Sequence, residues 1–366
     1  SQVQGRLTLG GNDVRITPDT PALSRARGAV QFSETGFSLV GVQARALGGD
    51  VRLEGGMRAL PPGAPPSEAV LQLRAQGMAS AEGLRQAREL GLLSQLAHKA
   101  TGSAPYAFTL ALRRGVPELQ VSSSLQGLAL ALPAPMGKPA ESSMPVRFEN
   151  QLTREALAPV AVPARPPPLH DQLTLDIEGV GSVHYVRDLG TPQPRVLRGA
   201  IALGLAREES APLPERGVAA NIQVGEVDVD AWESLLLGPA TGERAPVTSG
   251  NGEAGAIQDY LPHVLAVRAK ALTVQGRTLH HVLVGGSREG RVWRANLDAQ
   301  ELNGYVEYRQ AGAQDAGAGR LFARLARLTV PQSAASEVEA LLDEQPGNLP
   351  SLDIVVQDFE LRGRKL

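Results

Sequence analysis

The sequence predicts a mainly β protein built as one elongated, repetitive antiparallel sheet, with a few short helices packed on the sheet or capping it. Three observations lead to this prediction: apolar and polar residues alternate along most of the chain, long phrases of sequence recur, and helical patterns are few. Alternation with a period of two is typical of strands whose side chains point in turn to opposite faces of a sheet. Recurrence of a long phrase is typical of repeat proteins, in which each unit packs on its neighbours.

The predicted strands are clearest where aliphatic residues occupy every second position. Examples are "AVLQLRAQG" from Ala69, "YAFTLALRRG" from Tyr106, "DQLTLDIEG" from Asp171 and "NIQVGEVDV" from Asn221. In each segment the apolar positions would form one face of a strand and the polar positions the other. The segments are separated by Pro-rich or Gly-rich stretches, which are typical of surface loops.

Two phrases recur along the chain. "LPHVLAVRAKALTVQGRTL" begins at Leu261, and "LPSLDIVVQDFELRGRKL" begins at Leu349, which is 88 residues later. This period is longer than one strand pair, so the repeated unit is expected to be a meander of several strands. A shorter phrase, leucine followed two residues later by glycine, contains Gly49, Gly199 and Gly304, where we expect turns that need a positive φ or a bulge.

Helical patterns interrupt the predicted sheet at three places. Ser80 can cap a helix over residues 80–101, whose apolar stripe would be Leu93, Leu96, Ala97 and Ala100. Shorter helices are expected after Asp230, with Glu233 completing a capping box, and near residues 336–344. The resulting division has β-meanders at 1–78 and 104–237, a helical insertion at 79–103, a flexible loop at 238–258 and a β-repeat unit at 259–366, which would form one continuous groove.

Composition narrows the classes of function. The chain has 366 residues, a formal net charge of -2 and no cysteine. A near-neutral charge gives no reason to expect a nucleic acid partner. Sulfur-ligated zinc and thiolate chemistry are excluded by the absence of cysteine, and no apolar run is long enough for a transmembrane helix. Lack of cysteine favours an oxidising compartment only weakly.

A search for catalytic motifs finds nothing specific. The chain contains no G-x-S-x-G, no phosphate-binding loop and no H-E-x-x-H, and the adjacent His280 and His281 would point to opposite faces of a strand. Carboxylates two residues apart occur at Asp176 with Glu178 and at Asp228 with Asp230, and we interpret both pairs as solvated sheet residues. The sequence therefore predicts no enzyme, no cofactor and no metal.

What remains is the predicted apolar face. A large apolar face must be curled on itself, capped by helices or filled by a ligand, because an exposed one is an interaction site. Aliphatic residues dominate it and aromatic rings are few, which suits acyl chains, although a dry protein core fits composition equally well. The candidates for the lining of a lipid-binding groove are Val51, Leu53, Leu71, Leu73, Leu110, Leu112, Leu173, Leu175, Ile201, Leu203, Val267, Leu272, Val274 and Val306.

Several segments resemble the YhdP-type members of the AsmA-like family of Gram-negative bacteria. They are "LPHVLAVRAKALTVQGRTLHHVLVGGSREGRVWRANLDAQELNGYVEYR", "GRLFARLARLTVP" and "LPSLDIVVQDFELRGRKL", together with "VGEVDVDAWESLLLG", "LGGDVRLEGG" and "RRGVPELQVSSSLQGLALALPAP". The resemblance implies a taco-like β-groove with an apolar floor, similar to the bridge-like lipid-transfer proteins of eukaryotes. It implies a protein that spans the periplasm and carries phospholipid from the inner to the outer membrane, without catalytic residues.

The resemblance also implies partners. These would be phospholipid acyl chains and, through segments outside this chain, the inner and outer membranes, with an N-terminal helix as the inner-membrane anchor. The sequence itself looks like an internal segment of a longer protein. Two alternatives remain open on the residues alone: a structural or adhesin-like β-repeat protein with a dry core, and a β-solenoid carbohydrate-active enzyme that would use acids such as Asp176 and Glu178.

Overall fold

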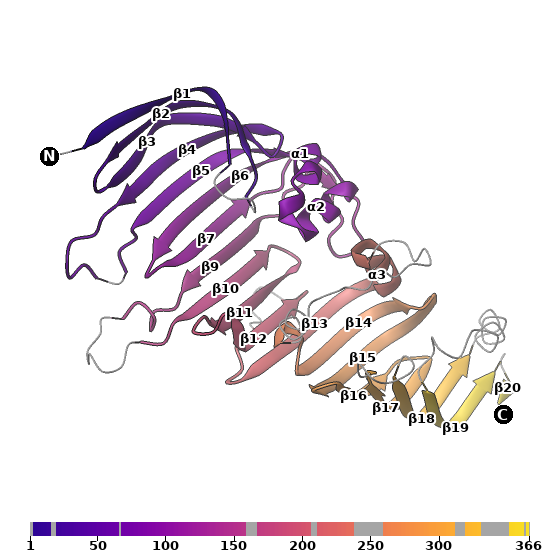
Figure 1. The fold of residues 1–366 in the computed structure, drawn as a ribbon. Coiled ribbons are helices and arrows are strands. Elements are labelled where there is room, and N and C mark those ends of the chain that lie inside the picture. The colour runs from indigo at the N-terminus through magenta and orange to yellow at the C-terminus, as the bar shows by residue number, and fades with distance from the viewer. Residues whose placement is uncertain are drawn as a thin grey trace. The chain divides into compact units, whose positions relative to one another are not determined.

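The computed structural model describes residues 3–15, 20–65, 67–158, 167–205, 211–237, 259–311, 319–330, 351–361 and 364–365. Most of these residues lie in strands, and the chain divides into two compact units, Ser1–Leu197 and Arg198–Leu366 (Figure 1). The prediction of a mainly β fold with mostly antiparallel pairing and a few short helices is confirmed. The predicted helix near residues 336–344 and the predicted loop at 238–258 lie outside the described residues.

The first unit is a sheet in which each strand pairs antiparallel with the next. The strands are β1 (Gln4–Val14), β2 (Leu23–Ser33), β3 (Gly36–Ala46), β4 (Gly49–Arg58), β5 (Leu71–Ser80), β6 (Ala100–Arg113), β7 (Val116–Ser123), β9 (Val146–Leu152), β10 (His170–Ile177) and β11 (Gly181–Asp188). The short β8 (Leu128–Leu130) pairs with the first residues of β6. Short turns join β2 to β3, β3 to β4, β6 to β7 and β10 to β11, and the other neighbouring strands are joined by longer connections.

The register gives the first unit one apolar and one polar face. Leu73 on β5 lies opposite Leu110 on β6, which in turn lies opposite Leu119 on β7. The adjacent residues Arg74 and Thr109 pair on the opposite side of the sheet. We call the side of Leu73 and Leu110 the apolar face of the first unit and the other side its polar face. The alternation in the sequence therefore corresponds to two chemically different faces.

Short helical segments connect β5 to β6. They are α1 (Ala81–Gln86), the 3-10 turn Arg88–Leu90, α2 (Leu92–Leu96) and the 3-10 turn Ala97–Lys99. Ser80 caps α1, as predicted, because its hydroxyl oxygen accepts a hydrogen bond from the backbone N–H of Gly83. The expectation of one helix is wrong: Gly91, with φ of 55°, separates the turns. Leu93 in the predicted apolar stripe is 58% exposed, whereas Ala97 and Ala100 are buried.

The second unit combines parallel and antiparallel pairs. Its strands are β12 (Arg195–Leu203, from Arg198 on), β13 (Gly217–Asp228), β14 (Val264–Val274), β15 (Arg277–Glu289), β16 (Val292–Asp298), β17 (Leu302–Arg309), β18 (Arg320–Val330), β19 (Ser351–Leu361) and β20 (Arg364–Lys365). The pairs β12–β13, β13–β14 and β18–β19 are parallel, and the others from β14 to β20 are antiparallel. A parallel pair requires a crossover, and α3 (Val229–Leu237) lies in the one between β13 and β14.

The capping box predicted at α3 is not the one that forms. The carboxylate of Asp228 accepts a hydrogen bond from the N–H of Ala231 at 2.9 Å and so caps the helix. Asp230 lies in the first turn and instead accepts bonds from the N–H groups of Gln275 and Gly276, at 2.6 and 2.7 Å. Both turn residues have positive φ, so this carboxylate connects the start of α3 to the tight turn between β14 and β15.

Glycine positions were predicted with mixed success. Gly49 begins β4 directly after a turn, but the positive φ belongs to Leu47 and Gly48 of that turn. Gly199 lies within β12, so the expectation of a turn is wrong there. Gly304 lies within β17 and not at a turn, but it has the expected positive φ, 152°, and a Cβ would meet the carbonyl oxygen of Arg324 at 2.4 Å. That close approach coincides with a β-bulge between β17 and β18.

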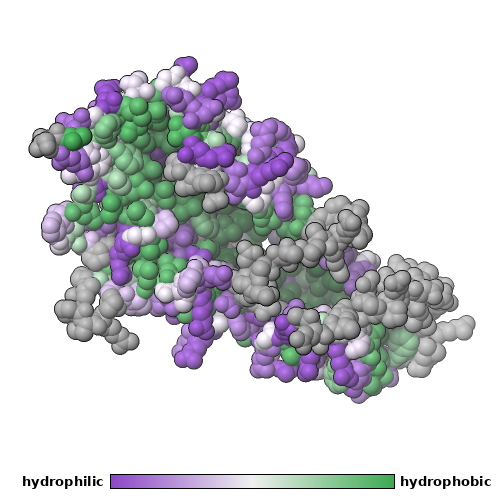
Figure 2. Space-filling view, in the orientation of Figure 1, coloured by the Kyte–Doolittle hydropathy of each residue, from purple (hydrophilic) through white to green (hydrophobic). Residues whose placement is uncertain are grey.

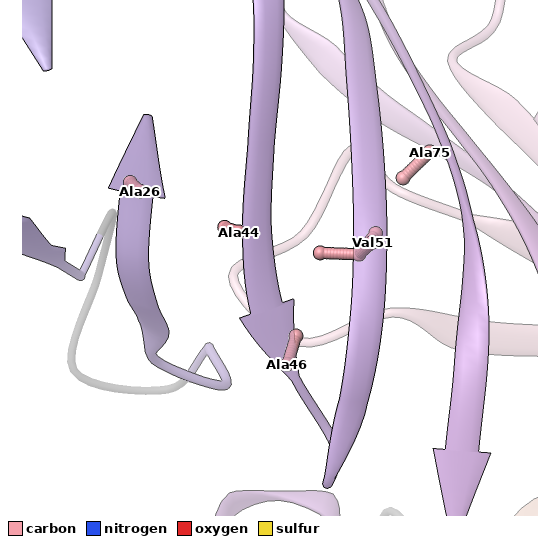
Figure 3. Close-up of a cluster of buried hydrophobic side chains, with 5 residues drawn as sticks. All are labelled: Ala26, Ala44, Ala46, Val51 and Ala75. Atoms are coloured by element: carbon pink, nitrogen blue, oxygen red, sulfur yellow. The ribbon is translucent and has the colours of Figure 1, made fainter. Parts of the chain in front are cut away.

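The buried core consists mainly of small side chains. One cluster joins Ala26, Ala44, Ala46, Val51 and Ala75, which come from β2 to β5 (Figure 3). Among the described residues, Val218 and Val282 are the largest apolar side chains that are less than 2% exposed. In a two-layered protein, leucine and phenylalanine are usually the most buried residues. The large aliphatic side chains of this chain must therefore lie elsewhere.

Candidate functional site: the apolar faces of the two units

The eight lining residues predicted in the first unit all lie on its apolar face. Register links Leu71 with Leu112 and Leu73 with Leu110, and it links Leu53 with Ala75, two residues after Leu73 on β5. The linked set is Val51, Leu53, Leu71, Leu73, Leu110, Leu112, Leu173 and Leu175. Alternation thus brings together aliphatic side chains from four strands that are up to 124 residues apart, from Val51 to Leu175.

Rows of side chains cross the apolar face of the first unit from strand to strand. One row runs from Leu7 on β1 through Val30 and Leu39, and continues through Leu73, Leu110 and Leu119 to Leu173 and Tyr185. The space-filling view shows apolar residues gathered over this unit, with polar residues around them (Figure 2). The face therefore has an aliphatic surface several strands wide, with direct neighbours closer together than the length of an acyl chain.

The large side chains on this face are not buried. Of the fourteen predicted lining residues in both units, only Val51 is buried, Val274 is 37% exposed, and the other twelve are partly exposed. Leu7 and Phe32, on the same face of the first unit, are 56% and 45% exposed. A second packed layer would remove such side chains from water. Their exposure shows that, in the described part of the chain, protein covers this face only partly.

The second unit has an apolar face of the same kind. Ile201 and Leu203 on β12 pair with Ala220 and Ile222 on β13, and Ile222 pairs with Val267 on β14. The row continues through Val284 to Leu297, which pairs with Gly304 on β17. Val306 lies two residues after Gly304 and therefore on the same side of the sheet. We call this side the apolar face of the second unit.

Leu272 and Val274 reach the same face only because β14 is irregular. Leu272 lies five residues after Val267, so strict alternation would place it on the opposite face. Pairing on both sides of β14 skips Lys270, and the skipped position on β15 is His281, which has φ of 53°. β13 skips Gly225 at the same place, so the pairing register is the same before and after this interruption. Beyond it, Leu272 packs with Leu279 against the buried Ala269, Val282 and Ala299, so the aliphatic side chains are again on the apolar face.

Sequence reasoning missed the aromatic and terminal parts of these faces. Phe108 and Phe148 pair with Val121 on the apolar face of the first unit, and Leu352 and Ile354 extend that of the second. Phe108 lies two residues before Leu110, so alternation could have identified it. Leu352 is 60% exposed and Ile354 45% exposed, which shows that the face remains open to solvent as far as β19.

A few polar groups occur on the apolar face of the first unit. Burial raises the pKa of the Tyr106 hydroxyl, which keeps this side chain neutral at ordinary pH. At the other end of the same face, Arg187 donates two hydrogen bonds to Asp171, at 3.0 and 2.5 Å, and one to Asn150 at 3.3 Å. Asp171 is only 1% exposed, so its charge is balanced inside the protein.

The carboxylates considered for catalysis do not lie on the apolar faces. Asp176 is on the polar face of β10, opposite Arg147 and Ser182, and Glu178 follows the end of that strand. Asp228 and Asp230 bind backbone N–H groups at α3, as described above. These acids have structural or solvated positions.

The described residues contain neither a cluster of metal ligands nor a helix suited to crossing a membrane. No group of three or more histidine or acidic side chains in this part of the chain is arranged to hold a metal ion. None of the helices that the structure describes is both long and apolar enough to cross a bilayer.

A repetitive, mostly antiparallel sheet with a half-exposed aliphatic face in each compact unit defines a class of β-repeat proteins that present apolar surface. Such a surface is the expected contact for an apolar ligand or partner. The chain belongs to the YhdP protein family, whose profile matches residues 1–366. No curated protein and no solved structure gives a significant match.

Proposed function

We propose that this chain is a segment of a non-enzymatic lipid-transport protein of the Gram-negative periplasm. In this proposal the apolar faces carry the acyl chains of phospholipids between the inner and outer membranes. Segments outside this sequence would connect the protein to both membranes, with an N-terminal helix as the inner-membrane anchor. Membership of the YhdP family supports this assignment.

One observation supports the proposal above all others: the large aliphatic side chains gather on one face of each unit and stay partly exposed. Twelve of the fourteen predicted lining residues are partly exposed, although they are leucine, isoleucine or valine. Leaving such surface in water costs roughly 25 cal/mol per Å². A ligand that covers the face would remove this cost, and acyl chains match its aliphatic composition.

The mechanism follows from partition between water and the apolar face. Each CH₂ group that leaves water contributes about 0.8 kcal/mol, so an acyl chain binds through many small and equivalent contacts. Because neighbouring rows of leucine and valine are alike, a bound chain can move from one row to the next without a large barrier. The charged headgroup stays in water, since burying it without a partner is costly.

The alternatives make different demands on the structure. A structural protein with a dry core requires the aliphatic side chains to be buried, and their partial exposure weighs against it. A carbohydrate-active enzyme would require Asp176 and Glu178 in a cleft beside aromatic rings. Asp176 instead lies on the polar face, between Arg147 on β9 and Ser182 on β11. The lipid proposal therefore accounts for more of the observed geometry.

The proposal is tested by asking what occupies the apolar face. The chain would be expressed in the periplasm, purified without detergent and extracted for mass spectrometry, beside an unrelated periplasmic protein. A photo-crosslinking amino acid at Leu173 on the apolar face should capture phospholipid, and the same amino acid at the adjacent Gln172 on the polar face should not. Lipid at the level of the control protein, or equal capture at both positions, would contradict the proposal.

A further inference from the structure

A hollow of about 640 Å³ lies on the polar face of the second unit, opposite the face assigned to lipid. Register places its side chains in two transverse rows. The first row contains Asn221, Ala266, Gly285, Asn296 and Tyr305, and the second contains Gln223, Arg268, Leu283, Asp298 and Asn303. All ten residues line the hollow, together with the residues between the two rows, which are Ile222, Val267, Val284, Leu297 and Gly304. Its volume falls within the roughly 300–1,000 Å³ of small-molecule sites.

The hollow exists because side chains are small at its centre. Ala266 on β14 and Gly285 on β15 are directly paired, and larger residues surround them on both rows. A Cβ at Gly285 would meet no atom within 4 Å, and Gly285 does not have a positive φ. Neither backbone conformation nor crowding therefore requires glycine at this position. The hollow is open at its centre because position 285 has no side chain.

The walls offer hydrogen-bond donors and acceptors in balance. Amide groups of Asn221, Asn296 and Asn303 each provide both a donor and an acceptor. The carboxylate of Asp298 accepts one bond from Asn303 at 3.0 Å, which leaves further acceptor capacity. Arg268 contributes a positive charge that offsets the negative charge of Asp298, so the lining has no net charge from these side chains.

Apolar contacts are also present at the walls. Leu283 is 44% exposed at the middle of the second row, on a face that is otherwise polar. The ring of Tyr305 lies in the first row, and its hydroxyl donates a hydrogen bond to Glu307 at 3.3 Å, which fixes the ring at one side of the hollow. A ligand that fits this lining must carry many hydroxyl or amide groups and also a C–H surface.

We propose that this hollow is a binding site for a neutral saccharide. Sugar rings combine hydroxyl groups, which amides and carboxylates bind in pairs, with C–H faces, which pack on tyrosine and leucine side chains. An anion is disfavoured because Asp298 opposes it, and an acyl chain because the walls are polar. The site lies on the opposite face from the one assigned to lipid, so either proposal can fail without affecting the other.

The test fills the hollow without changing its walls. In Gly285→Trp the new ring occupies the open space, and Gly10→Trp is the matched control. Gly10 also has no atom within 4 Å of an added Cβ and no positive φ, but it lies on β1 of the first unit. Binding of a tetramer of N-acetylglucosamine, of maltohexaose and of an anionic oligogalacturonate would be measured by calorimetry and by saturation-transfer NMR on the full chain.

We expect saturable binding of at least one neutral oligosaccharide, weakened at least tenfold by Gly285→Trp and unchanged by Gly10→Trp. Circular dichroism checks that both variants fold. If Gly285→Trp does not fold, the double variant Asn221→Ala with Asn296→Ala repeats the test. Three results would overturn the assignment: no saturation by either neutral oligosaccharide, equal affinity in the filled variant, or tighter binding of the anionic oligosaccharide. Lipid content should be the same in all variants, because the apolar face is untouched.

Discussion

Replacing Leu110 by aspartate should greatly weaken lipid binding to the first unit while leaving its sheet folded. Leu110 lies in the middle of the apolar face, between Leu73 on β5 and Leu119 on β7, and it is partly exposed. The new carboxylate can keep part of its hydration in the lipid-free protein, because the face is open. An acyl chain lying over the same position would have to displace that water.

The size of both effects follows from the position of the side chain. Full burial of a leucine contributes about 1.5–3 kcal/mol, so the loss of a half-buried one should lower the free energy of unfolding by about 1–2 kcal/mol. An acyl chain that loses contact for three CH₂ groups loses about 2.4 kcal/mol of binding free energy, which is roughly 50-fold in affinity. Desolvation of the carboxylate adds to this loss.

The matched control is Thr109→Asp, one residue away on the same strand. Thr109 is on the polar face and pairs with Arg74 and Gln120, so a carboxylate there stays hydrated beside a positive charge. Phospholipid per mole of protein would be measured by mass spectrometry, and the free energy of unfolding by urea titration. Equal lipid content in the two variants would refute the assignment of the lipid to the apolar face.

Three further perturbations test electrostatic and local contacts. Burial raises the pKa of Glu301, but hydrogen bonds from the His280 ring and backbone N–H outweigh this effect and hold the pKa below its usual range. Stability from this pair should therefore be present above the ordinary carboxyl pKa and be lost as the pH falls through the lowered pKa. Glu301→Gln should remove this loss from acid-unfolding curves. Asp230→Ala should cost about 1–3 kcal/mol and speed amide hydrogen exchange in the turn between β14 and β15, whereas unchanged exchange would contradict its anchoring role. Arg187→Ala should destabilise the first unit by roughly 3–5 kcal/mol in urea unfolding because Asp171 stays buried without its partner, and Asp171→Asn in the same chain should recover part of the loss.

The general architecture was predictable because strand alternation is a local property of the sequence. Aliphatic residues at every second position of β5, β6 and β10 face one side, and the structure places all eight residues chosen in the first unit on that side. Nothing local indicates which strand pairs with which, however. β7 pairs with β9 and not with β8, although residues 124–145, which include β8, separate β7 from β9 in the sequence.

Helices were harder to predict than strands because the apolar spacing does not show where a helix breaks. Residues 80–101 suggest one amphipathic helix, but Gly91 interrupts it and Ala100 already belongs to β6. Leu93 then points into solvent although it lies in the predicted stripe. At α3 the sequence analysis took Asp230 as the cap, but Asp228 caps the helix. The choice between them depends on the turn after β14, which lies more than 40 residues away in the sequence.

The recurrent phrases acquire a structural meaning in the second unit. The first phrase contains β14 and the second contains β19. Each of these strands pairs in parallel with the preceding strand and antiparallel with the following one. Each phrase therefore marks the place where the chain returns through a crossover and begins a new hairpin. The positions on the apolar face correspond with a spacing of 87 and not 88 residues: Leu265 with Leu352, Val267 with Ile354, and Leu272 with Phe359.

The same correspondence includes the interruption of pairing. Pairing skips Lys270 in β14 and, 87 residues later, Gln357 in β19, and in each case the parallel neighbour skips one residue as well, Gly225 or Ala326. Two copies of the same interruption at one position indicate that it is part of the repeated unit, because it keeps aliphatic side chains on one face where strict alternation would turn them away.

Deleting Lys270 tests whether this interruption has this role. The skipped residues Gly225 and His281 would remain on the neighbouring strands, so the deletion should turn Leu272 from the Ala269–Val282 cluster to the polar face, and the loss of a half-buried leucine should cost about 1–2 kcal/mol in the free energy of unfolding. Lys270→Ala is the control: the residue is exposed and the backbone length is unchanged, so its cost should stay within about 0.5 kcal/mol. Both would be measured by urea titration. If the deletion is no more costly than the substitution, the strand can realign without Lys270, and the repeated unit must hold its apolar face by another means.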